Sequence, residues 1–268
     1  MYAKTRTMLF LAALAVFGLW SVAAEAQEQT QKTYYGQTSA LGQSAVRTYV
    51  TVDKNQAPVA LGLEFPATAL RNLPAETSNI ILEFPSQAGK TPFKYIMFDW
   101  NPQGHEPDRV YTLPHFDIHF YIQDLAEVNR IDPGPCNGLA CDDFGRAMLP
   151  VPPQLMPQGY VNVGAAVPRM GNHLIDPSAP EFNGQPFTRT FLYGVYEGKL
   201  TFYEPMISLA HLQSRPDETI NLKVPSAVAS SGYYPTKYSI KYNAETEVYT
   251  IALEGFVQRS GMETASKK

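Results

Sequence analysis

The chain has 268 residues, 44% of them hydrophobic, and a formal net charge of −4 at neutral pH. This length suits one large all-β domain or two small ones. A mildly acidic chain without a basic block is a poor binder of nucleic acid, so no nucleic-acid partner is expected. The 22 prolines and 16 tyrosines, without a long amphipathic helical pattern, favour many strands joined by ordered loops.

The N-terminal residues have the pattern of an export signal. Lys4 and Arg6 precede an apolar run over residues 8–23, and Ala24-Glu25-Ala26 offers small residues for cleavage. This pattern predicts a secretory signal peptide over residues 1–26, followed by a polar leader over 27–42. No second long apolar run follows. We therefore expect a secreted or periplasmic protein without membrane insertion.

Residues 43–260 are expected to form a single β-rich domain, followed by a polar tail over 261–268. Runs of alternating or continuous apolar residues predict its strands. In chain order these are 44–53, 58–65, 79–84, 93–100, 112–122, 188–196, 199–207, 236–242 and 247–257. Short helices are expected at 66–74, between two prolines, and at 122–131, where apolar residues recur at helical spacing. The fold class is an antiparallel β-barrel or sandwich of eight to ten strands.

The segment 132–187 is rich in Pro, Gly and Asn and is expected to be a long covering loop. Loops of this length are usually functional or mobile. The segment contains both cysteines, Cys136 and Cys141. In an oxidising compartment the expected state is a disulfide, although a C-x4-C pair can also contribute to a metal site.

The strand expected at 112–122 has two different faces. Successive side chains of a strand point to opposite sides. One face therefore carries Phe116, Ile118, Phe120 and Ile122, and the other carries His115, Asp117, His119 and Tyr121. Three titratable groups on one face are costly to bury without a metal, a substrate or a network of charges.

Imidazole and carboxylate together suit a divalent metal ion such as Zn, Mn, Fe, Cu or Ni. The ligands that we predict for one mononuclear site are His115, His119, His173 and Glu204, with His105 as an alternate. Asp117 and Glu106 are the candidate catalytic groups, and Asp117 could also orient a ligand. His115 and His119 lie about 13 Å apart on a straight strand. A shared ion would therefore need a bulge, a sharp twist or a helical turn.

Several segments carry a resemblance to a known family. They are RTYVTVDKNQAPVALGLEFPATALRNLP, FDWNPQGHEP, PHFDIHFY, MGNHLID, YGVYEGKLTFYEPMI and GYYPTKYSIKY. In this order they resemble an uncharacterised family of exported bacterial proteins with a domain of unknown function, whose structural representative comes from Thermus. The resemblance covers nearly all of the chain after the signal and implies a β-rich domain. Its most specific segments include His105, His115, Asp117 and His119.

Two hypotheses of different class follow. The first is an exported metal-binding β-barrel protein with a His/Glu mononuclear site, which could serve a metal-dependent enzyme. The second is a non-catalytic protein of the cell envelope that binds a small-molecule ligand or assembles as a homo-oligomer. In the second case the polar strand is a hydrogen-bond network, and the tyrosine-rich walls hold the ligand or a partner subunit.

Overall fold

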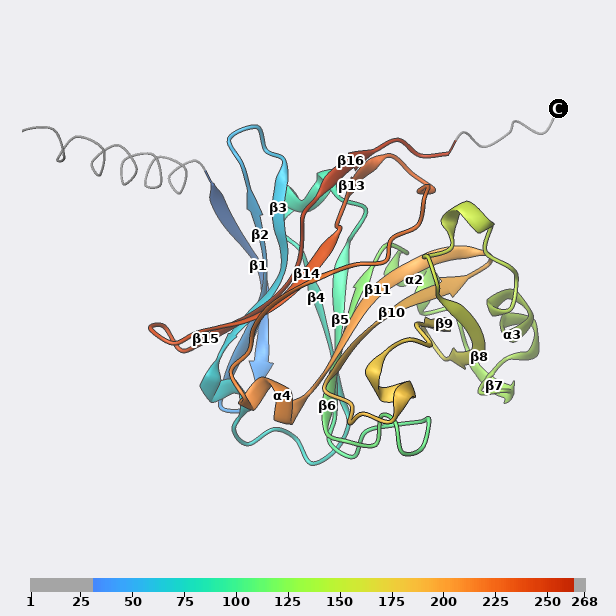
Figure 1. Cartoon of the computed structure of the whole chain (residues 1–268), viewed down its shortest axis with the longest axis horizontal. Helices are drawn as coiled ribbons and strands as arrows, with labels where there is room; N and C mark the ends of the chain where they lie inside the picture. Colours follow the sequence, from blue (N-terminus) through green and yellow to red (C-terminus); the bar gives the residue numbers. More distant parts are fainter. Residues whose placement is uncertain (1–30, 263–268) are drawn as a thin grey trace, which may run out of the picture.

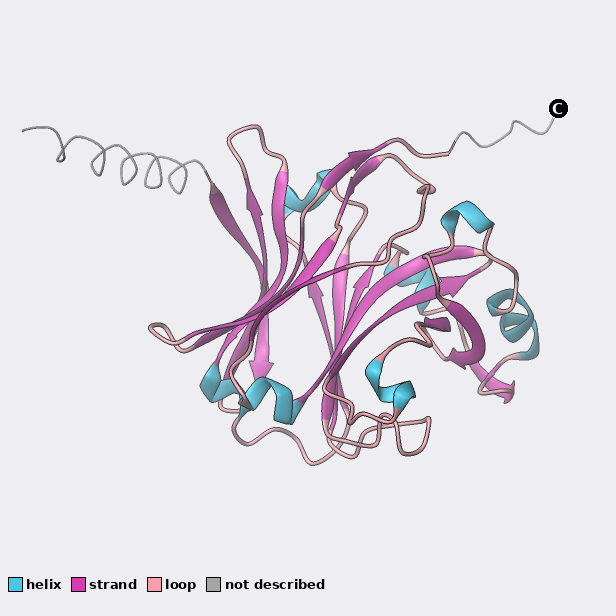
Figure 2. Ribbon diagram, in the orientation of Figure 1, coloured by secondary structure: helices cyan, strands magenta, loops and turns pink. Residues whose placement is uncertain are grey.

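This computed structural model describes residues 31–262 of the chain. They form two large antiparallel sheets, a two-stranded sheet and a layer of short elements that covers one of the large sheets (Figures 1 and 2). The first sheet has the order β1 (Lys32–Leu41), β2 (Ser44–Val52), β3 (Pro58–Pro66), β15 (Val248–Glu254), β14 (Lys237–Asn243), β12 (Asp217–Asn221). The second has the order β4 (Ser78–Glu83), β5 (Tyr95–Asn101), β6 (His115–Tyr121), β11 (Lys199–Ser208), β10 (Arg189–Tyr196), β9 (Gly171–Ile175), β8 (Val161–Val167).

The remaining elements are short. β13 (Gly232–Tyr234) pairs with β16 (Val257–Arg259), and β7 (Pro133–Cys136) lies in the covering layer. The α-helices described are α2 (Leu125–Val128), α3 (Cys141–Ala147) and α4 (Leu209–Gln213). The 3-10 helices are η1 (Ala67–Leu70), η2 (Ser86–Lys90), η3 (Pro153–Leu155) and η4 (Pro180–Asn183). Within residues 31–262, no helix is both long and apolar enough to cross a membrane.

The predicted mainly-β, antiparallel class is confirmed, and the sheets form a sandwich; among the described residues they do not close into a barrel. The main core joins the two sheets. Phe116, Ile118 and Phe120 of β6 are fully buried in it, together with residues of the first sheet such as Leu61 and Ile251. Burial of each such side chain contributes about 1.5–3 kcal/mol to folding. The period-2 pattern of β6 therefore fixes its apolar face against the first sheet.

The opposite face of β6 is buried as well, beneath the segment that follows it. The ring of Tyr121 packs with Phe202 of β11 and Val128 of α2, and its hydroxyl donates to the carbonyl of Arg169 at 2.9 Å. This covering layer appears in green and yellow at the right of Figure 1. All seven residues of β6 are consequently buried, so its titratable side chains lie in the protein interior.

Several segments differ from the sequence-based expectation. The range 132–187, expected to be a long covering loop, contains β7, α3, β8 and β9, and the last two extend the second sheet. Residues 32–41, expected within the polar leader, form the edge strand β1, whose polarity fits its exposed position. The expected helices at 66–74 and 122–131 shorten to η1 and α2. Prolines and turn residues concealed the strands within 132–187. β1 and β8 are edge strands, which backbone pairing can hold without an alternating apolar pattern.

Two predictions made from short stretches of sequence are confirmed. The hairpin β10–β11 turns at Glu197 and Gly198, both with positive φ (52° and 70°), as two-residue turns of this kind require. Cys136 and Cys141 form the expected disulfide. The predicted signal peptide, residues 27–30 of the leader and residues 263–268 of the tail lie outside the described part of the chain.

Candidate metal centre

Strand register brings the titratable side chains together around β6. β6 lies between β5 and β11 in the second sheet. On β5, Asp99 is opposite Asp117 and Met97 is opposite His119. On β11, Glu204 lies between Phe202, which is opposite Tyr121, and Met206, which is opposite Asp117. Side chains at these positions share one face, so the face that carries the histidines also carries carboxylates from both neighbouring strands.

Four of the five histidines fall into two groups. We call His119, His173 and Glu204 the buried cluster, and His105, His115 and Asp117 the rim cluster. Within each cluster, one ligand atom per residue lies within 4.8 Å of the others. The predicted residues His119, His173 and Glu204 are thus brought together, whereas His115 joins the predicted alternate, His105. The straight course of β6 explains the separation, because a strand without a bulge keeps residues 115 and 119 apart.

The buried cluster is nearly closed to solvent. Nε2 of His119 lies 3.2 Å from Oε1 of Glu204, and Nε2 of His173 lies 3.7 Å from Oε2. The side chains of these three residues are 1%, 10% and 3% exposed. Oε2 of Glu204 has no hydrogen-bond partner within the described residues. An unpaired buried carboxylate oxygen is costly, so the arrangement calls for a positive charge between these side chains.

The ring orientation of both histidines is set by the backbone. Nδ1 of His173 lies 2.9 Å from the carbonyl of Ala165, and Nδ1 of His119 lies 3.3 Å from that of Met97. A carbonyl only accepts hydrogen bonds, so Nδ1 carries the proton in each ring. Nε2 then presents a lone pair to Glu204 unless it is protonated. This arrangement, with one nitrogen bound to a backbone carbonyl and the other free, is typical of metal-ligating histidines.

The electrostatics of the two imidazoles differ. Burial disfavours the charged form of both. At His119 the negative charges of Glu204 and Asp99 outweigh burial and raise the pKa well above its ordinary value. At His173 burial dominates and lowers the pKa. His173 is therefore neutral at pH 7, and its Nε2 is available as a ligand.

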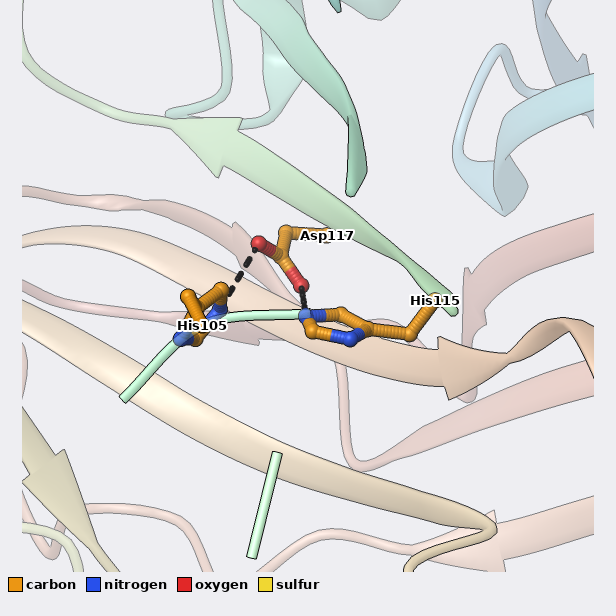
Figure 3. A group of neighbouring side chains, drawn as sticks. All are labelled: His105, His115 and Asp117. Carbon is orange, nitrogen blue, oxygen red and sulfur yellow. Dashed lines mark hydrogen bonds and ion pairs between the residues drawn. The ribbon is translucent and has the colours of Figure 1, made fainter. Parts of the chain in front are cut away.

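The rim cluster has the same plan with better access to solvent (Figure 3). Nε2 of His105 lies 3.2 Å from Oδ2 of Asp117, and Nε2 of His115 lies 3.1 Å from Oδ1. Nδ1 of each ring lies 2.6 Å from a backbone carbonyl, that of Glu106 for His105 and that of Leu113 for His115. The His105 side chain is 41% exposed and that of His115 is fully buried. The rim cluster therefore meets solvent through His105.

Charge pairing perturbs the rim cluster in the metal-free protein. Burial alone would raise the pKa of Asp117, but its contacts with the imidazoles of His105 and His115 lower it well below its usual range. Burial likewise disfavours the His105 imidazolium, but the hydrogen bond and charge of Asp117 raise its pKa to about 9. A proton on Nε2 of His105 thus takes the place that a cation could occupy.

This pair predicts a pH dependence of stability after treatment with a chelator. The folded-state pKa of His105, about 9, lies above its ordinary value of 6.5. Its contribution is fully present below pH 6.5 and is lost as the pH rises through 9. We expect urea unfolding to show a loss of stability over this window that His105→Gln abolishes. His211→Gln is the control, because burial lowers the pKa of His211. This variant should still lose stability as the pH rises through the same window. If it does not, the pH dependence cannot be assigned to His105.

Two residues that sequence reasoning missed support the clusters. Oδ2 of Asp99 lies 3.2 Å from Nδ1 of His119, beside the Met97 carbonyl, and Asn79 donates to its other oxygen at 2.5 Å. Asn101 donates to Oδ2 of Asp117 at 2.8 Å. Asp99 thus lies next to His119 and Asn101 binds Asp117, in the way that outer residues of metal sites contact the ligands. In the run YIMFDWN, Asp99 and Asn101 alternate with their neighbours so that they share the strand face of Met97. This alternation is the sequence pattern that could have placed them on the face of the histidines.

The nitrogen–oxygen contacts in both clusters are close to the spacing of ligands around a divalent ion. Ligand atoms about 2.0–2.2 Å from a zinc-sized ion are about 2.8–3.6 Å apart in octahedral or tetrahedral sites. The nitrogen–oxygen distances of 3.1–3.7 Å in the two clusters lie at or near this range. Two imidazoles and one carboxylate are a known ligand set for zinc and for non-haem iron. The chemistry of the residues therefore fits the metals expected from the sequence.

The packing of Phe202 maintains the buried cluster. Its ring centroid lies 4.9 Å from that of His119 and 5.3 Å from that of His173. Gly194, opposite Phe202 on β10, makes room for this ring, because a Cβ at Gly194 would lie 2.1 Å from a ring carbon. A glycine is therefore required here for close packing and not for a turn.

Glu106, the other candidate catalytic residue, has its side chain outside both clusters. Glu106 is exposed, and it contributes to the rim cluster only its backbone carbonyl, which accepts from His105. His211, which is not among the predicted site residues, lies with its Nε2 3.5 Å from Oε1 of Glu218 on β12, a strand that the sequence did not reveal.

Comparison with known proteins gives no match for this chain among protein-family models, curated proteins or solved structures. The resemblance to the exported bacterial family stays a prediction. What the fold and the site define is a class: an antiparallel β-sandwich with two His/carboxylate clusters on one buried sheet face.

Proposed function

We propose that this chain is an exported protein that binds a divalent metal ion through His119, His173 and Glu204. One observation carries the proposal: Nε2 of both histidines is directed at a buried carboxylate, while Nδ1 of each is engaged by a backbone carbonyl. Oε2 of Glu204 has no hydrogen-bond partner among the described residues, and the neutral ring of His173 presents a lone pair to it. A cation between them satisfies all three groups at once.

The proposed location rests on the sequence and the disulfide. The N-terminal pattern is that of a signal peptide, and a disulfide between Cys136 and Cys141 is stable in the periplasm or outside the cell. A resident metal site in such a compartment suits zinc, manganese, iron, copper or nickel.

The ligand set leaves room for chemistry. A bound ion with three protein ligands retains a position for water or a substrate oxygen, which it would polarise. Asp99 holds the His119 ring in place from the far side. Phe202 and the covering layer exclude bulk water, so charges within the cluster act at low dielectric.

The first test measures metal content. Purified wild-type protein should contain a stoichiometric metal by elemental analysis, and equilibrium dialysis should restore it after chelation. His173→Ala should weaken binding at the buried cluster by more than about 100-fold, since even loss of an outer hydrogen-bond partner costs about 10–100-fold. His211→Ala is the matched control and should bind like wild type. Absence of stoichiometric binding of Zn, Mn, Fe, Cu and Ni at this cluster would refute the proposal.

A non-catalytic assembly protein is the alternative, and it has one observation of its own. β8 is an edge strand of the second sheet, and its Val161, Val163 and Val167 are 40%, 54% and 38% exposed. Apolar edges of this kind favour pairing with another chain. Protein without metal that elutes as an oligomer would favour this alternative.

A further inference from the structure

The rim cluster is built independently of the buried cluster. It shares no residue with it, and His105 comes from the 102–114 connection between β5 and β6 rather than from a strand. Within that connection the N–H of His105 donates to the carbonyl of Tyr111 at 3.0 Å, and the N–H of Gly104 donates to the carbonyl of Asn101, the last residue of β5, at 3.2 Å. The His105 ring packs against both Tyr111 and His115, at centroid distances of 5.9 and 4.7 Å. The position of His105 is therefore defined without help from the buried cluster.

Two polar atoms of the rim cluster face each other without a hydrogen bond. Nε2 of His115 and Oδ1 of Asp117 are 3.1 Å apart, and both lack a hydrogen-bond partner among the described residues. His115 is 0% exposed and Asp117 is 5% exposed. Since Nδ1 of His115 already donates to Leu113, a neutral ring points a lone pair at the carboxylate. A proton shared between His105 and Asp117 leaves Nε2 of His115 and Oδ1 of Asp117 without a partner. One cation bound between the three side chains would coordinate both histidines and the carboxylate.

Charge balance allows both clusters to be filled. Asp117 and His119 are two residues apart on β6, about 7 Å along the strand. Asp99, Asp117 and Glu204 place three carboxylates around the two positions. These negative charges offset much of the repulsion between two divalent ions.

We infer that the rim cluster is a second divalent-cation site, formed by Nε2 of His105, Nε2 of His115 and a carboxylate oxygen of Asp117. It takes an ion of the borderline class, such as Zn²⁺, Fe²⁺ or Co²⁺. Because His105 is exposed, this ion exchanges with solvent while the ion of the buried cluster is retained. Binding also fixes the 102–114 connection to the sheet through His105. The site does not depend on the buried cluster, so it can be tested separately from the proposed function.

The test titrates the chelator-treated full chain with Co²⁺, whose visible absorption reports coordination, and counts bound ions by elemental analysis. Wild type should bind two ions per chain. His105→Ala should bind one, with affinity at the rim cluster reduced more than about 100-fold. His173→Ala should also bind one, the double variant none, and the control His211→Ala two. In wild type, brief exposure to a chelator should remove one ion before the other. The ion removed first should be the one that His105→Ala does not bind.

The outcomes separate the two proposals. If His105→Ala binds as many Co²⁺ ions as wild type with unchanged affinities, the rim site is refuted and the proposed function stands. If wild type binds a single ion that only His105→Ala removes, the rim site stands and the buried cluster fails. Absence of Co²⁺ binding refutes both. Because His105 is partly exposed, His105→Ala should fold, and Asp117→Asn provides a second variant that removes the ligand charge with little change in volume.

Discussion

Phe202→Ala is expected to lower the free energy of unfolding by about 3–5 kcal/mol, the usual cost of removing a fully buried phenylalanine. The side chain is 0% exposed and contacts the rings of His119, His173 and Tyr121. Its loss leaves a cavity beside the buried cluster, into which both imidazoles can rotate. We therefore expect metal affinity at this cluster to fall together with stability.

A matched control separates packing from metal binding. Phe65 of β3 is 1% exposed and stacks on Tyr249 within the core between the sheets. Phe65→Ala should cost a similar free energy of unfolding in urea, yet retain the metal of the buried cluster. Equal metal retention by both variants would show that Phe202 has no part in positioning the histidines.

Glu204→Gln should remove most of the stabilisation that metal binding gives. A free ion at about 1,000 times its dissociation constant stabilises a protein by about 4 kcal/mol. Glutamine keeps the volume of Glu204 but removes the charge that faces Nε2 of His119 and of His173. Thermal unfolding with and without added zinc should therefore show a large increase in melting temperature for wild type and a much smaller one for Glu204→Gln.

The control for this experiment lies in the first sheet. Glu254 pairs with Lys241 at 3.0 Å and accepts from Ser239, away from both clusters. Glu254→Gln should lose a little stability but keep the full increase on addition of zinc. If Glu204→Gln responds to zinc as strongly as Glu254→Gln does, the carboxylate is not a ligand.

Local periodicity was sufficient to predict β6 and its two faces. Alternation over residues 115–121 assigns Phe116, Ile118 and Phe120 to one side and the titratable groups to the other, whatever the strand packs against. The β10–β11 turn could also be predicted, because Gly198, which adopts positive φ without steric cost, stands in a two-residue connection between two alternating apolar runs. Both inferences depend only on neighbours in the sequence.

The composition of each cluster could not be predicted in this way. His173 comes from β9, which lay hidden in the Pro/Gly-rich range 132–187, and it reaches Glu204 only because β9 pairs with β10 beside Gly194. Asp99 supports His119 through the register between β5 and β6. Register across strands depends on pairing between distant segments, and a shift of one residue would send every side chain to the opposite face.

The sequence by itself therefore determined the β class, the disulfide and the face on which the titratable groups lie, since these follow from local pattern and composition. Only the tertiary structure decided that His115 and His119 belong to different clusters, that Asp99 and Asn101 stand behind them, and that the covering layer buries them. The physical reason is that a straight strand separates residues 115 and 119, while strand pairing joins each of them to partners far away in the chain.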